Sequence, residues 1–378
     1  MTAESRPEPA DACPSCGQPV WPGDNFCEAC RAELWPARVS GDRQEAPVAC
    51  PSCPGSQVDA DGYCESCGHK VPSASDHTEL DLGLIAGVTD RGLRHHRNED
   101  AMAIAVARTS EGPVSLAVVC DGVSTSSNPD EAAHAGARAA IGVLHAAVRG
   151  GEDLAIASAR AVKAAQQALG ELADQHRLAM NAPSATFVSA VLTSRAVVVC
   201  WLGDSRAYWL DAGTAADARQ LTLDDSVGQE LVNRGLLSEA EALASPGAHV
   251  VTGWIGADLR EAEPHVAQFT PAGRGVVLIC SDGLWNYRPE AAGLAELALP
   301  AAVTDPLGAA AALVRFAIDA GGADNVTAVL APFPPHGQPG QPGQHGQPGP
   351  HGQPGSAASD NAAAAAARTE ESRTDEPD

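Results

Sequence analysis

The sequence predicts an α+β fold in which antiparallel sheets and helices form layers, preceded by small cysteine-rich units. Three observations lead to this prediction. Short β-branched runs come in clusters, alanine-rich amphipathic stretches are inserted between the clusters, and most of the 11 cysteines lie near the N-terminus. Because predicted strands and helices do not alternate one for one, a doubly wound parallel sheet is disfavoured.

Eight cysteines before residue 70 form two units with the same internal spacing, offset by 37 residues. Each unit has two Cys-x2-Cys pairs, which together supply the four thiolates of a tetrahedral zinc site. The expected ligands are Cys13, Cys16, Cys27 and Cys30 in the first unit, and Cys50, Cys53, Cys64 and Cys67 in the second. We therefore expect two structural Zn²⁺ ions. A disulfide framework is the alternative, which a reducing cytoplasm disfavours.

Each cysteine unit resembles a zinc ribbon and is too small to bury a core, so bound metal would supply its folding energy. Residues 1–72 contain five Lys or Arg against eleven Asp or Glu. Protein docking or regulation is therefore a better hypothesis for these units than nucleic-acid binding. We predict the cysteine units over residues 1–75, followed by a linker over residues 76–83.

The segment from residue 84 to residue 334 is predicted to form one mixed domain. Its β-branched runs predict strands at residues 103–107, 114–120, 184–192, 196–202, 276–280 and 326–331. Its amphipathic stretches predict helices at residues 130–149, 152–176, 228–243 and 306–320. Cys120, Cys200 and Cys280 each end an apolar run and are interpreted as buried strand residues.

The two ends of the chain and its charge limit where the protein works and what it binds. The N-terminus lacks the pattern of a secretory signal and no apolar stretch is long enough to span a membrane, so we expect a soluble cytoplasmic protein. Residues 335–378 are rich in Pro, Gly, Gln, His and Ala and are predicted to be a disordered tail. The formal net charge of -24 argues against nucleic-acid binding.

Acidic residues follow several of the predicted strands. Asp121, Asp204 and Asp282 each come directly after or near the end of an apolar run, and Asp324 precedes the last predicted strand. A single Asp-Gly pair is ordinarily a hairpin turn. Four such positions predict carboxylates that converge at one edge of a layered sheet, where oxygen ligands would bind Mg²⁺ or Mn²⁺.

The order of these motifs resembles that of the type 2C metal-dependent serine/threonine protein phosphatases, bacterial type, over residues 84–334. The resemblance implies a four-layer α-β-β-α sandwich of two antiparallel sheets flanked by helices. It also implies hydrolysis of phosphoserine and phosphothreonine in proteins, with a serine/threonine kinase as the counterpart. The motifs are Thr89–Gly92 with Arg97–Asp100, Val119–Gly122, Gly203–Arg206, Ser281–Trp285 and Asp324–Thr327.

The resemblance also implies roles for individual residues. Asp121 would bridge two Mn²⁺ or Mg²⁺ ions, with the Gly122 carbonyl, Asp282 and Asp324 as further ligands. Glu99 would support the ligand shell of one ion, and Asp100 would orient water. Asp204 would help to hold a third ion of the kind found in bacterial relatives. The two ions would generate a hydroxide that attacks phosphorus.

Two departures from the family pattern affect the substrate side. Relatives place a phosphate-binding arginine where this chain has His95, with Arg94 and Arg97 beside it. Because alternate residues of an extended segment face opposite ways, either Arg94 with His96 or His95 with Arg97 points inward. The segment after Gly122 offers no evident general acid. A catalytically silent scaffold that binds phosphoproteins, with the zinc ribbons as docking modules, is the alternative function.

Overall fold

The computed structural model describes residues 11–13, 16–20, 26–31, 37–41, 50, 52–53, 57–59, 63–71, 73–177, 181–258 and 262–335. Nearly all of the predicted C-terminal tail, residues 336–378, lies outside the described residues.

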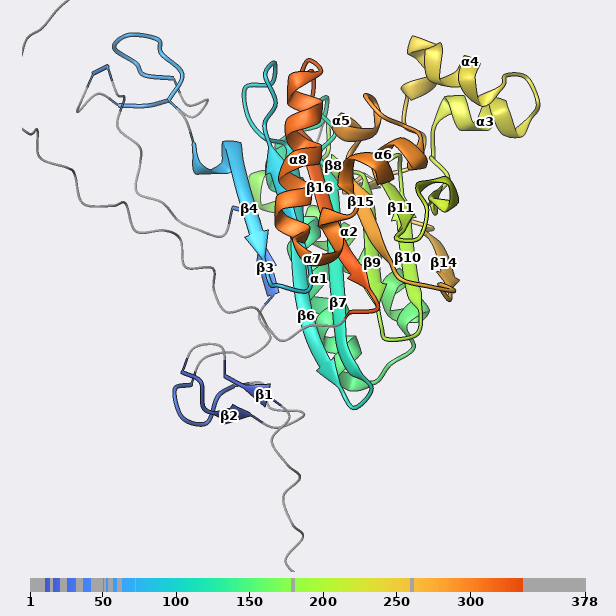
Figure 1. The fold of residues 1–378 in the computed structure, drawn as a ribbon. Helices are drawn as coiled ribbons and strands as arrows, with labels where there is room; N and C mark the ends of the chain where they lie inside the picture. The colour runs from blue at the N-terminus through green and yellow to red at the C-terminus, as the bar shows by residue number, and fades with distance from the viewer. Residues whose placement is uncertain are drawn as a thin grey trace, which may run out of the picture. The chain divides into compact units, whose positions relative to one another are not determined.

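Two antiparallel sheets of six strands each form the centre of the described domain (Figure 1). The first contains, in spatial order, β14 (His265–Phe269), β10 (Val197–Leu202), β9 (Phe187–Leu192), β7 (Gly112–Asp121), β6 (Asp100–Thr109) and β3 (Ala37–Val39). The second contains β12 (Arg219–Gln220), β11 (Arg206–Asp211), β15 (Gly275–Cys280), β16 (Val326–Phe333), β5 (Ala86–Asp90) and β4 (His77–Asp81). Two small sheets pair β1 (Asp11–Ala12) with β2 (Pro19–Val20), and β8 (Ser184–Ala185) with β13 (Ile255–Gly256).

Helices cover the outer face of each sheet. On the first sheet these are α1 (Pro129–Gly150) and α2 (Leu154–His176), which pack against β6, β7 and β10. On the second they are α5 (Asp282–Trp285), α6 (Ala291–Ala298), α7 (Ala301–Thr304) and α8 (Pro306–Asp319). Figure 1 shows α8 on one side of the two sheets and α1 and α2 on the other. The predicted four-layer α-β-β-α sandwich is confirmed.

Burial on both faces explains why the central strands are almost entirely apolar. Strand β10 reads Val-Val-Val-Cys-Trp-Leu and every residue in it is buried. One face of β10 packs into the core between the two sheets, which also contains Ile104 and Trp209. The other face packs into the core under α1 and α2. Small alanines on the helices allow close packing against the sheets. Cys120, Cys200 and Cys280 are fully buried, as predicted.

Helix boundaries follow local signals that the sequence contains. Pro129 is the first residue of α1, and Gly151, with φ +68°, follows its end. The Asp153 side chain accepts a hydrogen bond from the Ile156 amide at the start of α2. The helices predicted at residues 130–149, 152–176 and 306–320 are therefore confirmed.

The helix predicted over residues 228–243 is wrong in one respect, because the structure has two helices there. These are α3 (Val227–Asn233) and α4 (Glu239–Ala244). Gly235, with φ +69°, lies between them, and Ser238 and Glu241 form a capping box that starts α4. Gly235 and the capping box residues are both readable in the sequence, but the apolar periodicity over residues 228–243 favoured a single helix.

The stretch predicted as a linker, residues 76–83, contains a strand, β4. A short 3-10 helix (Ala74–Asp76) leads into β4, which pairs along its full length with β5. Similarly, β3 lies between the two cysteine units in sequence yet pairs with β6. Both strands lie at the edge of a sheet. In each, exposed side chains alternate with less exposed ones, so the apolar pattern that usually identifies a strand is weak. The other short 3-10 helices are at Ala215–Asp217 and Pro246–His249. No helix in the described ranges has the length and apolar character needed to cross a membrane.

Candidate active site

Asp100 and Asp121 lie opposite each other where β6 begins and β7 ends. The antiparallel register pairs the two residues directly. Asp121 is partly exposed, whereas Asp100 is 1% exposed. Opposite positions in an antiparallel ladder place Cβ atoms about 5 Å apart, where like charges repel. The sheet therefore places two carboxyl groups together at its edge.

One oxygen of Asp100 is fixed by hydrogen bonds and the other is not. Oδ2 accepts hydrogen bonds from Ser281 Oγ and from Thr327 Oγ1, both at 2.7 Å. Oδ1 is buried and has no hydrogen-bond partner among the described residues. Buried polar atoms are rarely left without a partner, so this oxygen fits the vicinity of a cation or its water shell.

Burial and neighbouring negative charges disfavour the ionisation of Asp100, Asp121 and Asp282. Burial raises the pKa of Asp121 well above its ordinary value, and the charges of Asp100, Asp282 and Asp324 raise it further. Burial and Asp324 together raise the pKa of Asp282 to about 7, although hydrogen bonds from Asn286 and Asp121 oppose the change. Burial raises the pKa of Asp100 to about 7 as well. A bound divalent cation would relieve this repulsion.

Asp324 is the fourth carboxylate and contacts His95. The Oδ1 atom of Asp324 lies 3.0 Å from Nε2 of His95. Burial opposes ionisation of Asp324, but the hydrogen bond and charge of His95 lower its pKa below the ordinary value. The same hydrogen bond raises the pKa of His95. This pair places His95 at the carboxylate cluster.

Gly92 allows the loop before His95 to approach Asp324 closely. Its φ is +72°, and a Cβ atom there would lie 2.1 Å from the carbonyl oxygen of Asp324. Glycine is therefore needed both for the backbone conformation and for the space. A similar restriction applies to Gly122, where a Cβ atom would lie 2.3 Å from the carbonyl oxygen of Pro129.

Glu99 connects β6 to the segment after β7. Its Oε2 accepts a hydrogen bond from Ser124 Oγ at 2.6 Å, and its Oε1 lies 3.3 Å from Arg97 Nε. The Glu99 carbonyl oxygen accepts from the Gly122 amide at 3.0 Å. Glu99 is 8% exposed, so it lies behind the cluster rather than at its mouth.

Asn325 organises the site, a role that the sequence analysis did not assign. Its Oδ1 accepts a hydrogen bond from the Glu99 amide at 2.8 Å. Its Nδ2 donates to the carbonyl oxygens of Arg91 and Arg97, at 2.8 and 3.1 Å. A buried amide with several backbone partners holds a loop in one conformation. In the sequence, the Asp-Asn pair at residues 324–325 is the feature that could have indicated this role.

Asp204 is buried, at 5% exposed. Burial raises its pKa well above the ordinary value, and the charge of Asp282 adds to the effect. The Trp285 indole donates to the Asp204 carbonyl oxygen at 2.9 Å. The Arg206 guanidinium lies 3.6 Å from the Trp285 ring centroid and forms a buried ion pair with Asp224 at 2.7 Å.

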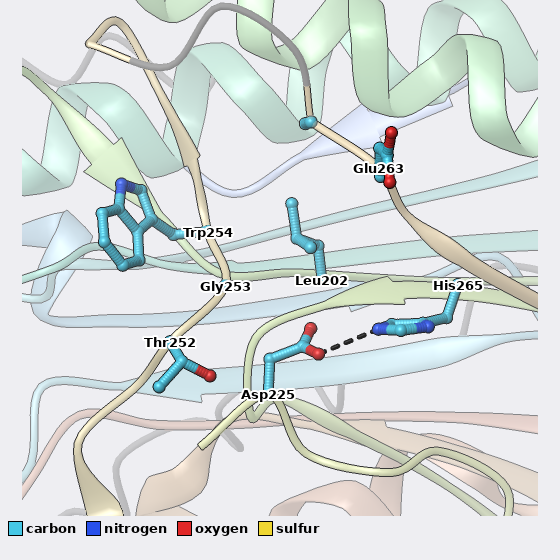
Figure 2. A pocket seen from close by; sticks show the side chains of 8 residues that line it. Leu202, Asp225, Thr252, Gly253, Trp254, Glu263 and His265 are labelled. Atoms are coloured by element: carbon cyan, nitrogen blue, oxygen red, sulfur yellow. Dashed lines mark hydrogen bonds and ion pairs between the residues drawn. The ribbon is translucent and has the colours of Figure 1, made fainter. Parts of the chain in front are cut away.

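A cleft of about 350 Å³ lies between the end of β10 and the segment before β14 (Figure 2). Asp225 and His265 form an ion pair at 2.8 Å within it. The other oxygen of Asp225 accepts a hydrogen bond from the Gly203 amide at 2.9 Å, and Trp201 stacks on His265. Asp225 therefore joins three backbone segments.

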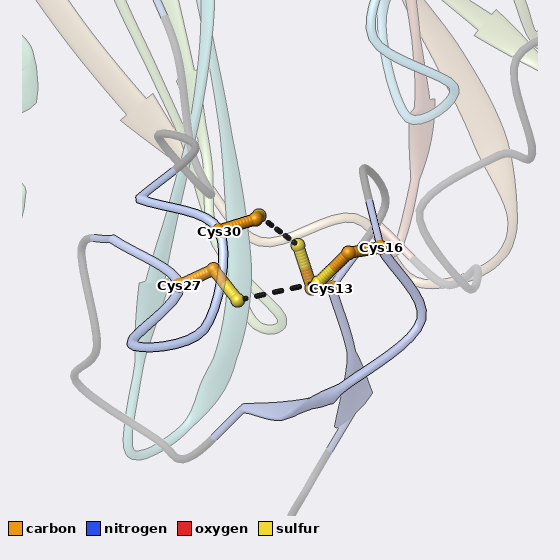
Figure 3. Close-up of side chains that lie close together, drawn as sticks. All are labelled: Cys13, Cys16, Cys27 and Cys30. Atoms are coloured by element: carbon orange, nitrogen blue, oxygen red, sulfur yellow. Dashed lines mark hydrogen bonds between the residues drawn. The ribbon is translucent and has the colours of Figure 1, made fainter.

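The first cysteine unit places its four sulfur atoms together (Figure 3). Sγ of Cys13 lies 3.7 Å from Sγ of Cys30, and Sγ of Cys16 lies 3.6 Å from Sγ of Cys27. Tetrahedral zinc with bonds of about 2.3 Å requires sulfur separations of about 3.8 Å. The Cys30 amide lowers the pKa of the Cys27 thiol to about 7, although burial opposes it. The donor set fits a tetrahedral thiolate site.

The second unit repeats this arrangement. Its four sulfurs also lie within 4.8 Å of one another, and Sγ of Cys50 is 3.7 Å from Sγ of Cys67. The Cys67 amide lowers the pKa of the Cys64 thiol to about 6, against the effect of burial. These cysteines are free thiols, which argues against the disulfide alternative.

The family model for protein phosphatase 2C matches residues 91–298, more than half of the chain. The matched range contains neither cysteine unit. Among curated proteins, the serine/threonine phosphatase stp of Listeria innocua is 28% identical over 250 residues, covering 64% of this chain and 92% of that protein. The serine/threonine protein phosphatase PstP of Mycobacterium tuberculosis is 28% identical over 246 residues, covering 65% of this chain and 44% of that protein.

Solved structures agree with this match. The crystal structure of the M. tuberculosis phosphatase PstP/Ppp superposes with a TM-score of 0.53 at 26% identity, covering 65% of this chain and 97% of that chain. The PstP catalytic domain in complex with two manganese ions gives a TM-score of 0.50 at 25% identity, covering 66% and 97%. On the family match, the fold and the order of its acidic motifs, this chain belongs to the protein phosphatase 2C family.

Proposed function

We propose that this chain hydrolyses phosphoserine and phosphothreonine in proteins and depends on Mn²⁺ or Mg²⁺. The observation that carries the proposal is that Asp100 lies directly opposite Asp121 in the sheet and accepts a hydrogen bond from Ser281, the residue before Asp282. Hydrolysis of a phosphoric monoester requires positive charge at this position, since the substrate brings further negative charge to an acidic site. Family membership and the named relatives support the same activity.

The proposed ligands of two divalent cations are Asp121, the Gly122 carbonyl, Asp282 and Asp324, with Glu99 behind them. When bound, the cations supply an activated water molecule and neutralise charge on the phosphoryl oxygens. Asp100 is held by Ser281 and Thr327 so that its free oxygen can orient water. Asp204 and Asp282 are proposed to hold a third ion.

His95 and Arg97 are proposed to form the substrate-phosphate side of the site. His95 contacts Asp324 and Arg97 contacts Glu99, whereas His96 contacts Tyr63. This geometry favours the pair of His95 and Arg97 over the pair of Arg94 and His96. Arg94 is exposed and forms no ion pair with a described residue, so it remains available to a substrate.

Phosphoprotein hydrolysis in vitro tests the activity. Wild-type protein with Mn²⁺ is expected to release phosphate from a phosphothreonine peptide, because the carboxylate cluster then binds its cations. Chelation should abolish release, and added Mn²⁺ should restore it. The scaffold alternative instead predicts peptide binding without phosphate release, so metal-independent binding with no turnover would contradict the phosphatase proposal. Such an activity implies a protein kinase that supplies the substrate, and we propose that both act in the cytoplasm.

We further propose that each cysteine unit binds one Zn²⁺. Elemental analysis of the full chain is expected to find about two zinc ions per molecule, because each unit offers four thiolates in a tetrahedron. The C16S/C30S variant should retain about one ion. The matched control, Cys200→Ala, removes a buried thiol outside both units and should retain two. Zinc absent from wild-type protein purified without chelator would refute this assignment.

A further inference from the structure

A hydrogen bond connects the second cysteine unit to the loop that carries His95. Tyr63 directly precedes Cys64, and its hydroxyl oxygen lies 2.7 Å from Nδ1 of His96. The two rings meet edge to face, with centroids 6.0 Å apart. Because His96 adjoins His95, which contacts Asp324, the contact reaches within one residue of the carboxylate cluster.

The position of Tyr63 depends on the turn that presents two of the cysteines. Tyr63 pairs with Lys70 across a short antiparallel bridge, and the Lys70 ammonium lies 5.2 Å from the centroid of the tyrosine ring. Between them, the Cys64 amide donates to the His69 carbonyl and the Gly68 amide donates to the Cys64 carbonyl. The tight turn of the Cys-x2-Cys pair therefore sets the direction of the Tyr63 side chain.

The chain that follows this turn is bound to both ends of the loop over residues 91–98. Ser75 accepts a hydrogen bond on its carbonyl oxygen from the Asn98 side chain at 3.3 Å. Asp76 accepts one on its carbonyl oxygen from the Arg91 amide at 2.8 Å. Only four residues separate Lys70 from Ser75 in sequence. These two hydrogen bonds do not involve Tyr63 or His96, yet they bind the chain just after the second cysteine unit to the same loop.

We propose that Tyr63 is a positioning residue for the phosphate-binding loop over residues 94–97, and that metal held by Cys50, Cys53, Cys64 and Cys67 keeps it in place. The proposal rests on the phosphatase function proposed above. A four-cysteine unit whose buried cluster is limited to Cys50, Cys64 and Val71, with Cys53 and Val58 beside it, is expected to depend on metal for its fold. Loss of that metal would release Tyr63 from His96 and give the loop more freedom. Phosphorylated substrate would then bind more weakly, while the carboxylate cluster that performs hydrolysis stays intact.

The Y63F variant tests the contact with the smallest change. In full-length protein with saturating Mn²⁺, we expect KM for a phosphothreonine peptide to rise about 3-fold, because one partly exposed hydrogen bond is lost. We expect kcat to change less than about 2-fold, since Tyr63 touches no group of the carboxylate cluster. Inhibition by inorganic phosphate should weaken in the same ratio as KM rises.

Matched cysteine variants test the dependence on metal. C53S/C67S removes two ligands of the second unit and is expected to raise KM about 10-fold, because Tyr63 and its turn are both released. C16S/C30S changes the corresponding positions of the first unit and should leave KM unchanged. Equal KM values for these two variants would contradict a special role of the second unit.

A double-mutant cycle shows whether Tyr63 acts through His96. The Y63F/H96A variant is expected to match H96A alone in KM, because both changes remove the same contact. Binding of a phosphonate analogue of the peptide gives the same comparison without turnover, so the result does not depend on activity. Wild-type affinity in Y63F, or additive effects of the two changes, would overturn the inference. An inactive wild-type protein would instead refute the phosphatase function.

Discussion

Replacing Asp282 by asparagine is expected to lower kcat for a phosphothreonine peptide by at least about 10³-fold, because Asp282 is a proposed cation ligand. Asp121→Asn should have an effect of similar size, since Asp121 lies opposite Asp100 at the centre of the cluster. Steady-state kinetics at several Mn²⁺ concentrations measure the change. The control Asp174→Asn alters an exposed aspartate near the end of α2 and should keep wild-type activity.

Thermal unfolding separates loss of a ligand from loss of the fold. Without divalent cations, Asp121→Asn is expected to melt at a higher temperature than wild type, because burial and four neighbouring carboxylates disfavour its charge. The stabilisation that Mn²⁺ gives the wild type should shrink in this variant, since binding stabilises only the state that binds. An inactive variant that melts well below wild type in chelator would contradict the electrostatic account.

Replacing Asp224 by alanine is expected to destabilise the domain by about 3–5 kcal/mol, because it leaves a buried guanidinium without its counter-ion. Both side chains of the Arg206–Asp224 pair are 8% exposed. Arg206 donates from two nitrogen atoms to Asp224, at 2.7 and 2.9 Å, and Trp285 covers the guanidinium. Denaturant unfolding gives the free energy directly.

A surface pair serves as the control for this change. Arg234 and Glu230 are 68% and 50% exposed at an ion-pair distance of 3.2 Å, so Glu230→Ala should alter stability by less than about 1 kcal/mol. The R206M/D224L variant removes both charges and should recover much of the loss, because no isolated charge stays buried. A loss in this double variant as large as in Asp224→Ala would show that packing, not charge, dominates.

The carboxylates were predictable because each of them lies beside an apolar run. Strand β7 ends in Asp121, directly before Gly122, whereas Asp282 and Gly283 begin α5 just after β15. Asn325 and Ser281 were not assigned roles, because their hydrogen bonds join segments far apart in sequence. Ser281, for example, reaches Asp100 across 181 positions.

Edge elements were the least predictable part of the fold. Strand β4 alternates exposed and partly buried residues and carries His77, Glu79 and Asp81, so its composition resembles that of a loop. Only its pairing with β5 makes it a strand. The boundary between α3 and α4 differs from β4, because here the local sequence does contain the signal. The capping box at Ser238 was readable, but the longer apolar pattern favoured a single helix.

The layered fold, the order of the acidic motifs and the two sets of clustered cysteines were predictable from sequence alone, because each depends on spacing along a single stretch of chain. Tertiary structure alone decided which residues of the loop over 94–97 face the carboxylates. The direction of those side chains follows from Gly92 at φ +72° and from Asn325, which donates to the carbonyl oxygens of Arg91 and Arg97. The contact of Tyr63 with His96 has the same origin, since it joins residues 33 positions apart that no local pattern relates.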